Sequence, residues 1–413
     1  MSWSLILSAI SNEIQVEKYF YSINNLKPEE CNYLPRIVKI KNHRFFKFIK
    51  SISFFIRLIW PYLLAPVYFI ICFFASCVYR FASLGRYSID KFETKHVSVF
   101  SANGDSSFLK AKKLINPEKT IILGDFTELF KNENVDFNFI SPYQVVTLCD
   151  LLKIFIISVF YNFRLLIEFN TRPWVMQGYT IFSILLRYRA LCRIKKNLII
   201  VDHFDRWAVL TDKVVSEIEK KEKKIITLTI IQHGILTTDY SDDKSSLPFD
   251  LTTRLNNVTD LIVYDELSKR IFLEKIISND SCRFKIFPPI LNLYFINSEN
   301  IKFLFVGHSI CLKFHVDLYL SLRNKYPEID FFYKPHPSQA MDEKTRNLGW
   351  KVYDKLDSFP DVDVVVSYPS TLAYEYHLSG KTVIQHSIHD TSLSSSSIII
   401  QIHEELKKRT TLC

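Results

Sequence analysis

The stretch FFYKPHP, residues 331–337, joins an apolar run to a rigid polar turn. The run Phe331 to Tyr333 has the length and composition of a buried strand. Two prolines then flank His336. Because proline lacks an amide hydrogen and restricts the residue before it, the strand must stop there. The sequence therefore predicts that this strand ends in a turn where the imidazole of His336 is accessible to a ligand, with Lys334 nearby.

Four other apolar runs also end in polar side chains. They are Phe303 to Val306 before Gly307 and His308, Val362 to Val366 before Ser367 to Thr371, Leu198 to Val201 before Asp202, His203 and Asp205, and Ile225 to Ile231 before Gln232, His233 and Gly234. In doubly wound α/β domains, ligands bind beyond the carboxyl ends of the strands. A single histidine after a strand is more often only a structural hydrogen-bonding group, but five such ends in one chain indicate ligand-binding residues.

Short apolar runs alternate with amphipathic stretches after Arg86, and this pattern predicts an α/β fold with mostly parallel sheets. The other expected strands are His96 to Phe100, Thr120 to Leu123, Phe137 to Ile140, Phe284 to Phe287 and Val383 to Gln385, and the expected helices are Leu151 to Phe169 and Tyr179 to Arg193. A join is expected near Pro288 to Asn300, where prolines and polar residues follow a strand. We expect one Rossmann-like domain over residues 91–290 and a smaller one over residues 291–413, facing a cleft.

Residues 1–90 have a different character. A basic run from Arg36 to Lys50 precedes the uncharged stretch Leu58 to Tyr79, which is long enough to cross a bilayer. Pro61 and Pro66 interrupt this stretch, so a re-entrant or interfacial helix held to anionic lipid headgroups is an alternative to a spanning helix. A buried core helix is a further alternative. We expect residues 1–90 to form a membrane-associated helical segment.

Composition excludes several classes of site. The chain of 413 residues has only 8 glycines, so a glycine-rich loop cannot be its main phosphate-binding device. Its 8 cysteines lack the close spacing of a zinc or redox motif, which favours a reduced, cytoplasmic location and predicts no metal site. The net charge of +9 raises nucleic acid as a partner. No zinc-finger spacing, RNA-binding aromatic motif or long basic helix supports that partner.

The C-terminal strand ends predict a phosphate site. His336 can donate a hydrogen bond to a phosphate oxygen, and Lys334 adds positive charge nearby. Ser370 and Thr371 open a helix, where hydroxyls and free backbone amides bind anions. Glu375 lies one turn further along and could reach a ribose hydroxyl. The structural alternatives are a rigid turn at His336, an ordinary N-cap at Ser370 and a solvated helix position at Glu375.

The two motifs together resemble a known group of enzymes. Residues 334–337 (KPHP), followed after one α/β step by residues 368–372 (YPSTL), resemble the His-Pro and Ser-Ser/Thr motifs of bacterial sialyltransferases and capsule polysialyltransferases. The pair is also similar to the donor site of glycerophosphotransferases that use CDP-glycerol. The resemblance implies a GT-B fold whose C-terminal domain binds the nucleotide, with His336, Ser370 and Thr371 at its phosphate. The N-terminal domain would then bind the acceptor.

The N-terminal motif departs from the sialyltransferase pattern. Those enzymes carry an acidic pair before glycine, whereas residues 232–234 of this chain read QHG. By the resemblance His233 is the catalytic base, as a His-Gly pair is similar to the glycerophosphotransferases, and Asp202 or Asp205 could orient it. The alternative is that His233 only binds the donor or holds its loop. In that case Asp202, His203 and Asp205 become the candidates.

These observations lead to one expected function. The chain is expected to be an inverting, metal-independent glycosyltransferase that uses a nucleotide sugar, with a CMP-sugar favoured, as substrate and needs no cofactor. The acceptor would be a lipid-linked or oligosaccharide precursor of a capsule, O-antigen or other surface glycan at the cytoplasmic face of the inner membrane. The alternatives are a CDP-glycerol-type polyol phosphate transferase, a non-catalytic scaffold of a polysaccharide assembly complex, and a sugar-nucleotide epimerase on a similar fold.

Overall fold

The chain folds into two compact units. Its structure, a computed structural model, describes residues 2–23, 26–35, 52–82, 98–102, 113–124, 138–168, 170–237, 244–279, 281–288, 291–336, 341–354, 359–388, 390 and 398–410. Unit 1 comprises Met1–His233 and Leu247–Phe287, and unit 2 comprises Gly234–Ser246 and Pro288–Cys413. The basic run from Arg36 to Lys50 and the second proline of the KPHP motif, Pro337, lie outside the described residues.

Unit 1 is built on a seven-stranded sheet with the order β3-β2-β1-β4-β5-β6-β7. The strands are β1 (Ser98–Ala102), β2 (Thr120–Leu123), β3 (Asn138–Ile140), β4 (Asn197–Val201), β5 (Leu228–Ile231), β6 (Asp260–Val263) and β7 (Arg283–Ile286). All neighbouring pairs are parallel. The order reverses between β1 and β4, which is the arrangement of a doubly wound Rossmann-like sheet.

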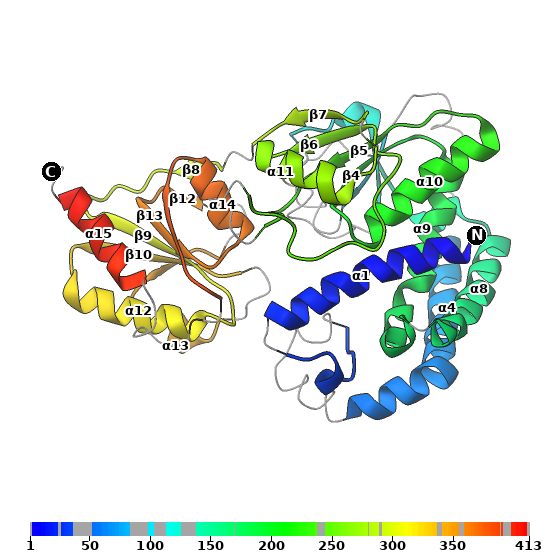
Figure 1. Ribbon diagram of the computed structural model, residues 1–413, viewed down its shortest axis with the longest axis horizontal. Helices are drawn as coiled ribbons and strands as arrows, with labels where there is room; N and C mark the ends of the chain where they lie inside the picture. Colours follow the sequence, from blue (N-terminus) through cyan, green and yellow to red (C-terminus); the bar gives the residue numbers. More distant parts are fainter. Residues whose placement is uncertain are drawn as a thin grey trace. The chain divides into compact units, whose positions relative to one another are not determined.

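The helices of unit 1 include the N-terminal helix of the chain (Figure 1). They are α1 (Trp3–Ile23), α4 (Ala65–Ala82), α7 (Pro142–Val145), α8 (Leu148–Ile167), α9 (Ile181–Ile194), α10 (Arg206–Glu222) and α11 (Glu266–Ile271). α1 packs against α10. The buried amide of Asn12 donates to the carbonyl oxygens of Phe204 at 2.9 Å and Thr253 at 2.8 Å. The first helix is thus packed into unit 1 by a mostly apolar buried side that also carries Asn12, Glu13 and Glu17.

The apolar stretch expected to meet a membrane lies in one helix over Ile52–Ala82, long and apolar enough to cross a bilayer. Pro61 and Pro66 do not break this helix, because Trp60–Leu64 forms a wider π-helical turn that accommodates them. Only 17% of its most apolar window is buried. The alternative of a buried core helix is therefore wrong.

Unit 2 is built on a five-stranded parallel sheet with the order β11-β10-β9-β13-β14. The strands are β9 (Ile301–Val306), β10 (Ile329–Lys334), β11 (Lys351–Val352), β13 (Val364–Ser367) and β14 (Thr382–Gln385), with the separate parallel pair β8 (Leu293–Tyr294) and β12 (Phe359–Pro360). The order again reverses at the first strand, between β9 and β13. The α/β class and the presence of two Rossmann-like sheets are therefore confirmed.

Helices cover both faces of the unit 2 sheet (Figure 1). α12 (Leu312–Lys325) and α15 (Ile398–Thr410) pack on one face, α14 (Thr371–Leu378) packs on the other, and α13 (Glu343–Arg346) precedes β11. Alternate residues of β9 enter different clusters: Phe303 and Phe305 face α12, and Leu304 and Val306 face the α14 side. Burial on both faces explains why the strands read as continuous apolar runs.

Candidate functional site

Polar groups gather at the carboxyl ends of β9, β10 and β13, where the strand order of unit 2 reverses. β9 lies between β10 and β13, and the last residue of each neighbour pairs with Val306. The chain therefore brings three strand-end loops to one edge of the sheet. This edge is where doubly wound domains bind ligands.

Two histidines and a tyrosine meet at this edge. The imidazole of His308, which follows β9, lies 5.2 Å from that of His336, after β10, and 5.5 Å from the ring of Tyr368, after β13. Burial, reinforced by the neighbouring His336, lowers the pKa of His308 to about 4, and burial also lowers the pKa of His336. Both rings are consequently neutral near pH 7 and each retains one N–H donor. The sequence analysis named His308 as a strand-end residue but did not include it among the predicted phosphate-binding residues.

Gly307 allows this loop to approach the sheet closely. Its amide donates to the carbonyl oxygen of Lys334 at 2.8 Å. A Cβ atom at position 307 would lie 1.9 Å from the hydroxyl oxygen of Tyr333, so the tyrosine would have to move. The absence of a side chain thus sets the position from which His308 projects.

The N-terminus of α14 lies at the same strand ends. Ser370 caps the helix by accepting from the amide of Ala373 at 3.2 Å, and its hydroxyl lies 3.1 Å from that of Ser367. The predicted N-cap is therefore present. Thr371 is the first helical residue, where the free amides and the helix dipole favour an anion.

Two other predicted donor-site residues are buried. Glu375, on α14, is 3% exposed, so the alternative of a solvated helix position is wrong. Lys334 is 7% exposed and its ammonium group lies 5.1 Å from the ring centroid of Phe359. This contact directs the charge of Lys334 toward the segment that carries β12.

Unit 1 brings two histidines together at the ends of β4 and β5. The imidazoles of His203 and His233 stack with centroids 4.2 Å apart. The backbone amide of His233 donates to Nε2 of His203 at 3.1 Å, so that nitrogen carries no proton. His203 is buried, so its ring stack and hydrogen bond hold His233 in a defined position.

Asp202 and Asp205 form a hydrogen-bonded carboxyl pair beside this histidine stack. Burial first, and the charge of Asp205 second, raise the pKa of Asp202 well above its ordinary value. Burial also raises the pKa of Asp205, whose carboxylate caps α10 by accepting from the amides of Trp207 at 2.7 Å and Ala208 at 3.3 Å. Asp202 in turn accepts from the amide of His203 at 3.1 Å. The pair is best described as sharing one proton, with Asp202 as the donor.

An ion pair completes the surroundings of these carboxyl groups, and the sequence did not predict it. Glu13 of α1 is 2% exposed and bonds the guanidinium of Arg206 at 2.6 Å and 3.2 Å. The charge of Glu13 contributes to the raised pKa of both Asp202 and Asp205. The available signal was an acidic residue in a helix with a largely apolar face, but nothing local indicates its partner 193 positions away.

The comparisons with known proteins find similarity only among solved structures. No family model and no curated protein matches the chain. It is similar to a putative UDP-N-acetylglucosamine 2-epimerase from Listeria monocytogenes, with 11% identity, a TM-score of 0.40 and coverage of 71% of this chain and 79% of that one. It is also similar to the wall teichoic acid polymerase TagF soaked with CDPG (12% identity, TM-score 0.36, 76% and 78% covered) and to Thermobaculum terrenum O-GlcNAc transferase (9%, 0.33, 74% and 56%).

Proposed function

We propose that the chain is a GT-B glycosyltransferase in which unit 2 binds a nucleotide-activated sugar and unit 1 activates the acceptor hydroxyl. The GT-B fold consists of two Rossmann-like units in one chain. The observation that carries the proposal is the convergence of His308, His336 and the N-terminus of α14 at one edge of the unit 2 sheet.

The donor side would bind phosphate through neutral donors. The imidazole N–H groups of His308 and His336 and the first amides of α14 supply directed hydrogen bonds without a glycine-rich loop. When the bond from the sugar to the phosphate breaks, negative charge grows on the departing nucleotide. Preorganised donors aimed at that charge stabilise the transition state more than the bound substrate.

The acceptor side would use His233 as general base. Its imidazole takes the proton of the acceptor hydroxyl while that oxygen attacks the anomeric carbon, and the nucleotide leaves with the bonding electron pair. Attack opposite the phosphate inverts the configuration of the sugar. His203 would position the base through the ring stack and the hydrogen bond that it accepts from the His233 amide. The Asp202 and Asp205 pair would hold His203 in place through the hydrogen bond that Asp202 accepts from the His203 amide.

Thermal stabilisation by CMP, CDP, UDP and GDP tests the donor site, because a bound ligand raises the apparent stability of the fold. We expect one nucleotide, with CMP favoured, to raise the Tm of the full chain and to lose that effect in His336→Ala. Product analysis with the matching activated sugar then distinguishes sugar transfer from polyol phosphate transfer. A chain that no nucleotide stabilises and that releases no nucleotide from any donor would contradict the proposal.

We further propose that the enzyme works on a membrane surface, through an apolar face shared by two helices. On the helix Ile52–Ala82 the side chains of Phe55, Tyr62, Phe74 and Val78 are 62–66% exposed, and on α8 those of Ile156, Phe160 and Ile167 are 56–82% exposed. The rings of Tyr62 and Phe163 lie 6.1 Å apart and join the two sets. We call this surface, on helix Ile52–Ala82 and α8, the apolar face; exposed apolar surface of this extent is typical of an interaction site.

The charges around the apolar face favour anionic lipid. The two helices carry four basic residues that are not buried, Arg57, Arg80, Lys153 and Arg164. Their one acidic residue, Asp150, is buried and paired with Arg189 and Arg193. Basic side chains next to an apolar helix surface bind the headgroups of anionic lipids. Because α8 is packed into unit 1, an interfacial arrangement accounts for both helices, whereas a spanning helix accounts for one.

Vesicle sedimentation tests this arrangement. We expect the full chain to sediment with vesicles that contain phosphatidylglycerol more than with pure phosphatidylcholine vesicles. The double variant Ile156→Glu, Phe160→Glu should lose binding, while Ile225→Glu, at an 86% exposed position of unit 1 outside the face, should keep it. Full binding by the double variant would favour a spanning helix, and no binding by the unchanged chain would contradict membrane attachment.

A further inference from the structure

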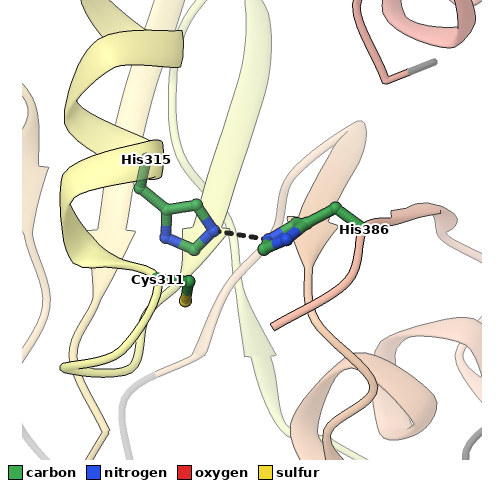
Figure 2. Close-up of side chains that lie close together, drawn as sticks. All are labelled: Cys311, His315 and His386. Atoms are coloured by element: carbon green, nitrogen blue, oxygen red, sulfur yellow. Dashed lines mark hydrogen bonds between the residues drawn. The ribbon is translucent and has the colours of Figure 1, made fainter. Parts of the chain in front are cut away.

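Three potential metal ligands lie together in the interior of unit 2, away from any sequence motif. Cys311 precedes α12, His315 lies one turn into that helix, and His386 follows β14. Their ligand-type atoms all lie within 4.8 Å of one another. Cys311 and His315 are 0% exposed and His386 is 5% exposed. Figure 2 shows the two imidazoles facing each other, with Cys311 beside His315 at the start of α12.

The hydrogen bonds fix the protonation of the two rings. Nδ1 of His386 lies 2.7 Å from the carbonyl oxygen of Ser387, which can only accept, so this nitrogen carries the proton and Nε2 has a lone pair. Nε2 of His315 lies 2.7 Å from Nε2 of His386 and must therefore be the donor of this hydrogen bond. Nδ1 of His315 is then an acceptor, and it is buried without a hydrogen-bond partner.

A metal ion would replace the proton between the two Nε2 atoms and bind the lone pair of each, and the ring proton of His315 would then lie on Nδ1. Metal-bound histidines commonly donate their other ring N–H to a backbone carbonyl, as His386 does to Ser387. The rings of Phe305 and Phe314 lie 5.4 Å from His315 and 4.9 Å from His386 and surround the cluster with apolar groups.

We propose that Cys311, His315 and His386 form a binding site for a zinc-class divalent cation. One thiolate and two imidazoles are ligands that zinc prefers, and the remaining tetrahedral position would hold a water molecule. The two Nε2 atoms must separate from 2.7 Å to about 3.3 Å if both are to lie about 2.0–2.1 Å from a tetrahedral zinc. Rotation of the two side chains can supply this small movement.

The site would act on the loop that carries His308. The thiol of Cys311 lies 3.6 Å from the carbonyl oxygen of His308, so the metal ligand and the phosphate-site histidine belong to one short connection between β9 and α12. Binding replaces the thiol proton of Cys311, which is released to solvent.

Metal titration of the untagged full chain tests the proposal. After treatment with a chelator, we expect the chain to take up one equivalent of Zn²⁺ with submicromolar affinity and to gain several degrees in Tm. Co²⁺ should give the near-ultraviolet thiolate-to-cobalt charge-transfer band and the visible bands of a tetrahedral site. These readouts require no donor or acceptor, so their failure is distinguishable from failure of the proposed transferase activity.

Variants assign the ligands. Cys311→Ser should lose the charge-transfer band, and His386→Gln should weaken zinc binding at least tenfold. Cys282 is also buried but lies in unit 1, so the control variant Cys282→Ser should keep the full spectrum. Absence of stoichiometric binding or of the thiolate band in the unchanged chain would overturn the proposal even if the variants fail to fold. Persistence of the band in Cys311→Ser would overturn it as well.

Discussion

The ring of His233 stacks on the buried ring of His203. Substitution of His233 can distinguish a role as general base from a role in binding the donor. His203 accepts from the backbone amide of His233, so the loop position does not depend on the His233 side chain. We expect His233→Ala and His233→Gln to fold and to bind nucleotide, yet to lose transfer by about two to four orders of magnitude, the usual share of general-base catalysis. Initial rates at saturating donor measure this loss.

The matched control for that experiment is His403→Gln on α15, which should retain full transfer rate. If His233→Ala instead shows weak nucleotide binding with near-normal turnover at saturating donor, His233 is a binding residue. In that case Asp202, His203 and Asp205 become the candidates for the base.

The carboxyl pair of unit 1 makes a prediction about stability. Asp202 holds the shared proton, so asparagine at this position keeps a donor toward Asp205, whereas alanine leaves a buried carboxylate without it. We expect Asp202→Asn to change the free energy of unfolding by less than about 1 kcal/mol, and Asp202→Ala to lower it by about 1–3 kcal/mol. Urea denaturation of the two variants measures the difference. Equal losses would show that Asp202 is not the proton donor.

His336 and Gly307 differ in what each contributes to the donor site. If the imidazole of His336 is a preorganised hydrogen-bond donor to the phosphate, as proposed, its removal in His336→Ala should cost about two to three orders of magnitude in turnover. Gly307→Ala should keep every polar group but displace Tyr333 and the loop before His308, because the new Cβ would lie 1.9 Å from the Tyr333 hydroxyl oxygen. Steady-state kinetics should show no turnover effect for His336→Ala if this ring has only a structural role.

At the scale of elements, α14 has a structural cap at the position where we propose that it binds phosphate. Ser370→Ala removes the hydrogen bond to the Ala373 amide and should lower the free energy of unfolding by about 1 kcal/mol. It should also weaken nucleotide affinity, since the cap orients the helix start. Asp342 caps α13 by accepting from the backbone amide of Thr345 at 2.7 Å. Asp342→Ala removes this cap and should lower the free energy of unfolding without changing nucleotide affinity.

Calorimetric titration with nucleotide compares these two cap variants. Equal affinity losses in Ser370→Ala and Asp342→Ala would mean that the effect passes through the stability of unit 2. A loss confined to Ser370→Ala would assign the phosphate to the start of α14.

Local patterns predicted most strands because burial in a parallel sheet leaves a readable apolar run. The expected run Thr120 to Leu123 has the bounds of β2, and Phe331 to Tyr333 lies inside β10 (Ile329–Lys334), whose ladder continues into polar Lys334. β6 (Asp260–Val263) was not expected. It is as long as β2, but its first residue is charged and its apolar run is only Leu261 to Val263. The prolines at 61 and 66 suggested a broken helix, and the π-helical turn that accommodates them has no local sequence signature.

At the scale of the molecule, the sequence predicted which side chains lie at strand ends but not their distant partners. The motif around His336 implied a phosphate site, and the topology then added His308 from the adjacent strand. Glu13 meets Arg206, and His386 meets His315, through packing of elements that are far apart in the chain. Such pairs follow from the tertiary arrangement, which local hydrophobic periodicity does not encode.

The two units should respond to acid in opposite directions. In unit 2, the lowered pKa values of His308 and His336 mean that the unfolded chain takes up protons below about pH 6.5 while the folded rings stay neutral. Stability from these groups is therefore lost as the pH falls from about 6.5 toward 4. In unit 1, the raised pKa values of Asp202 and Asp205 work the other way, because the folded state binds protons first.

Urea denaturation of the chelator-treated full chain at pH 7 and pH 5 measures this balance. A buried histidine with a folded pKa of about 4 would cost about 2 kcal/mol at pH 5, and solvent screening at the half-buried His308 reduces this to about 1 kcal/mol. The double variant His308→Gln, His336→Gln should therefore lose less stability between pH 7 and pH 5 than the unchanged chain. His377→Gln, at an exposed position of α14, should lose as much as the unchanged chain. Identical pH dependence in all three proteins would mean that neither ring is held neutral by the fold, and the neutral-donor description of the phosphate site would then fail.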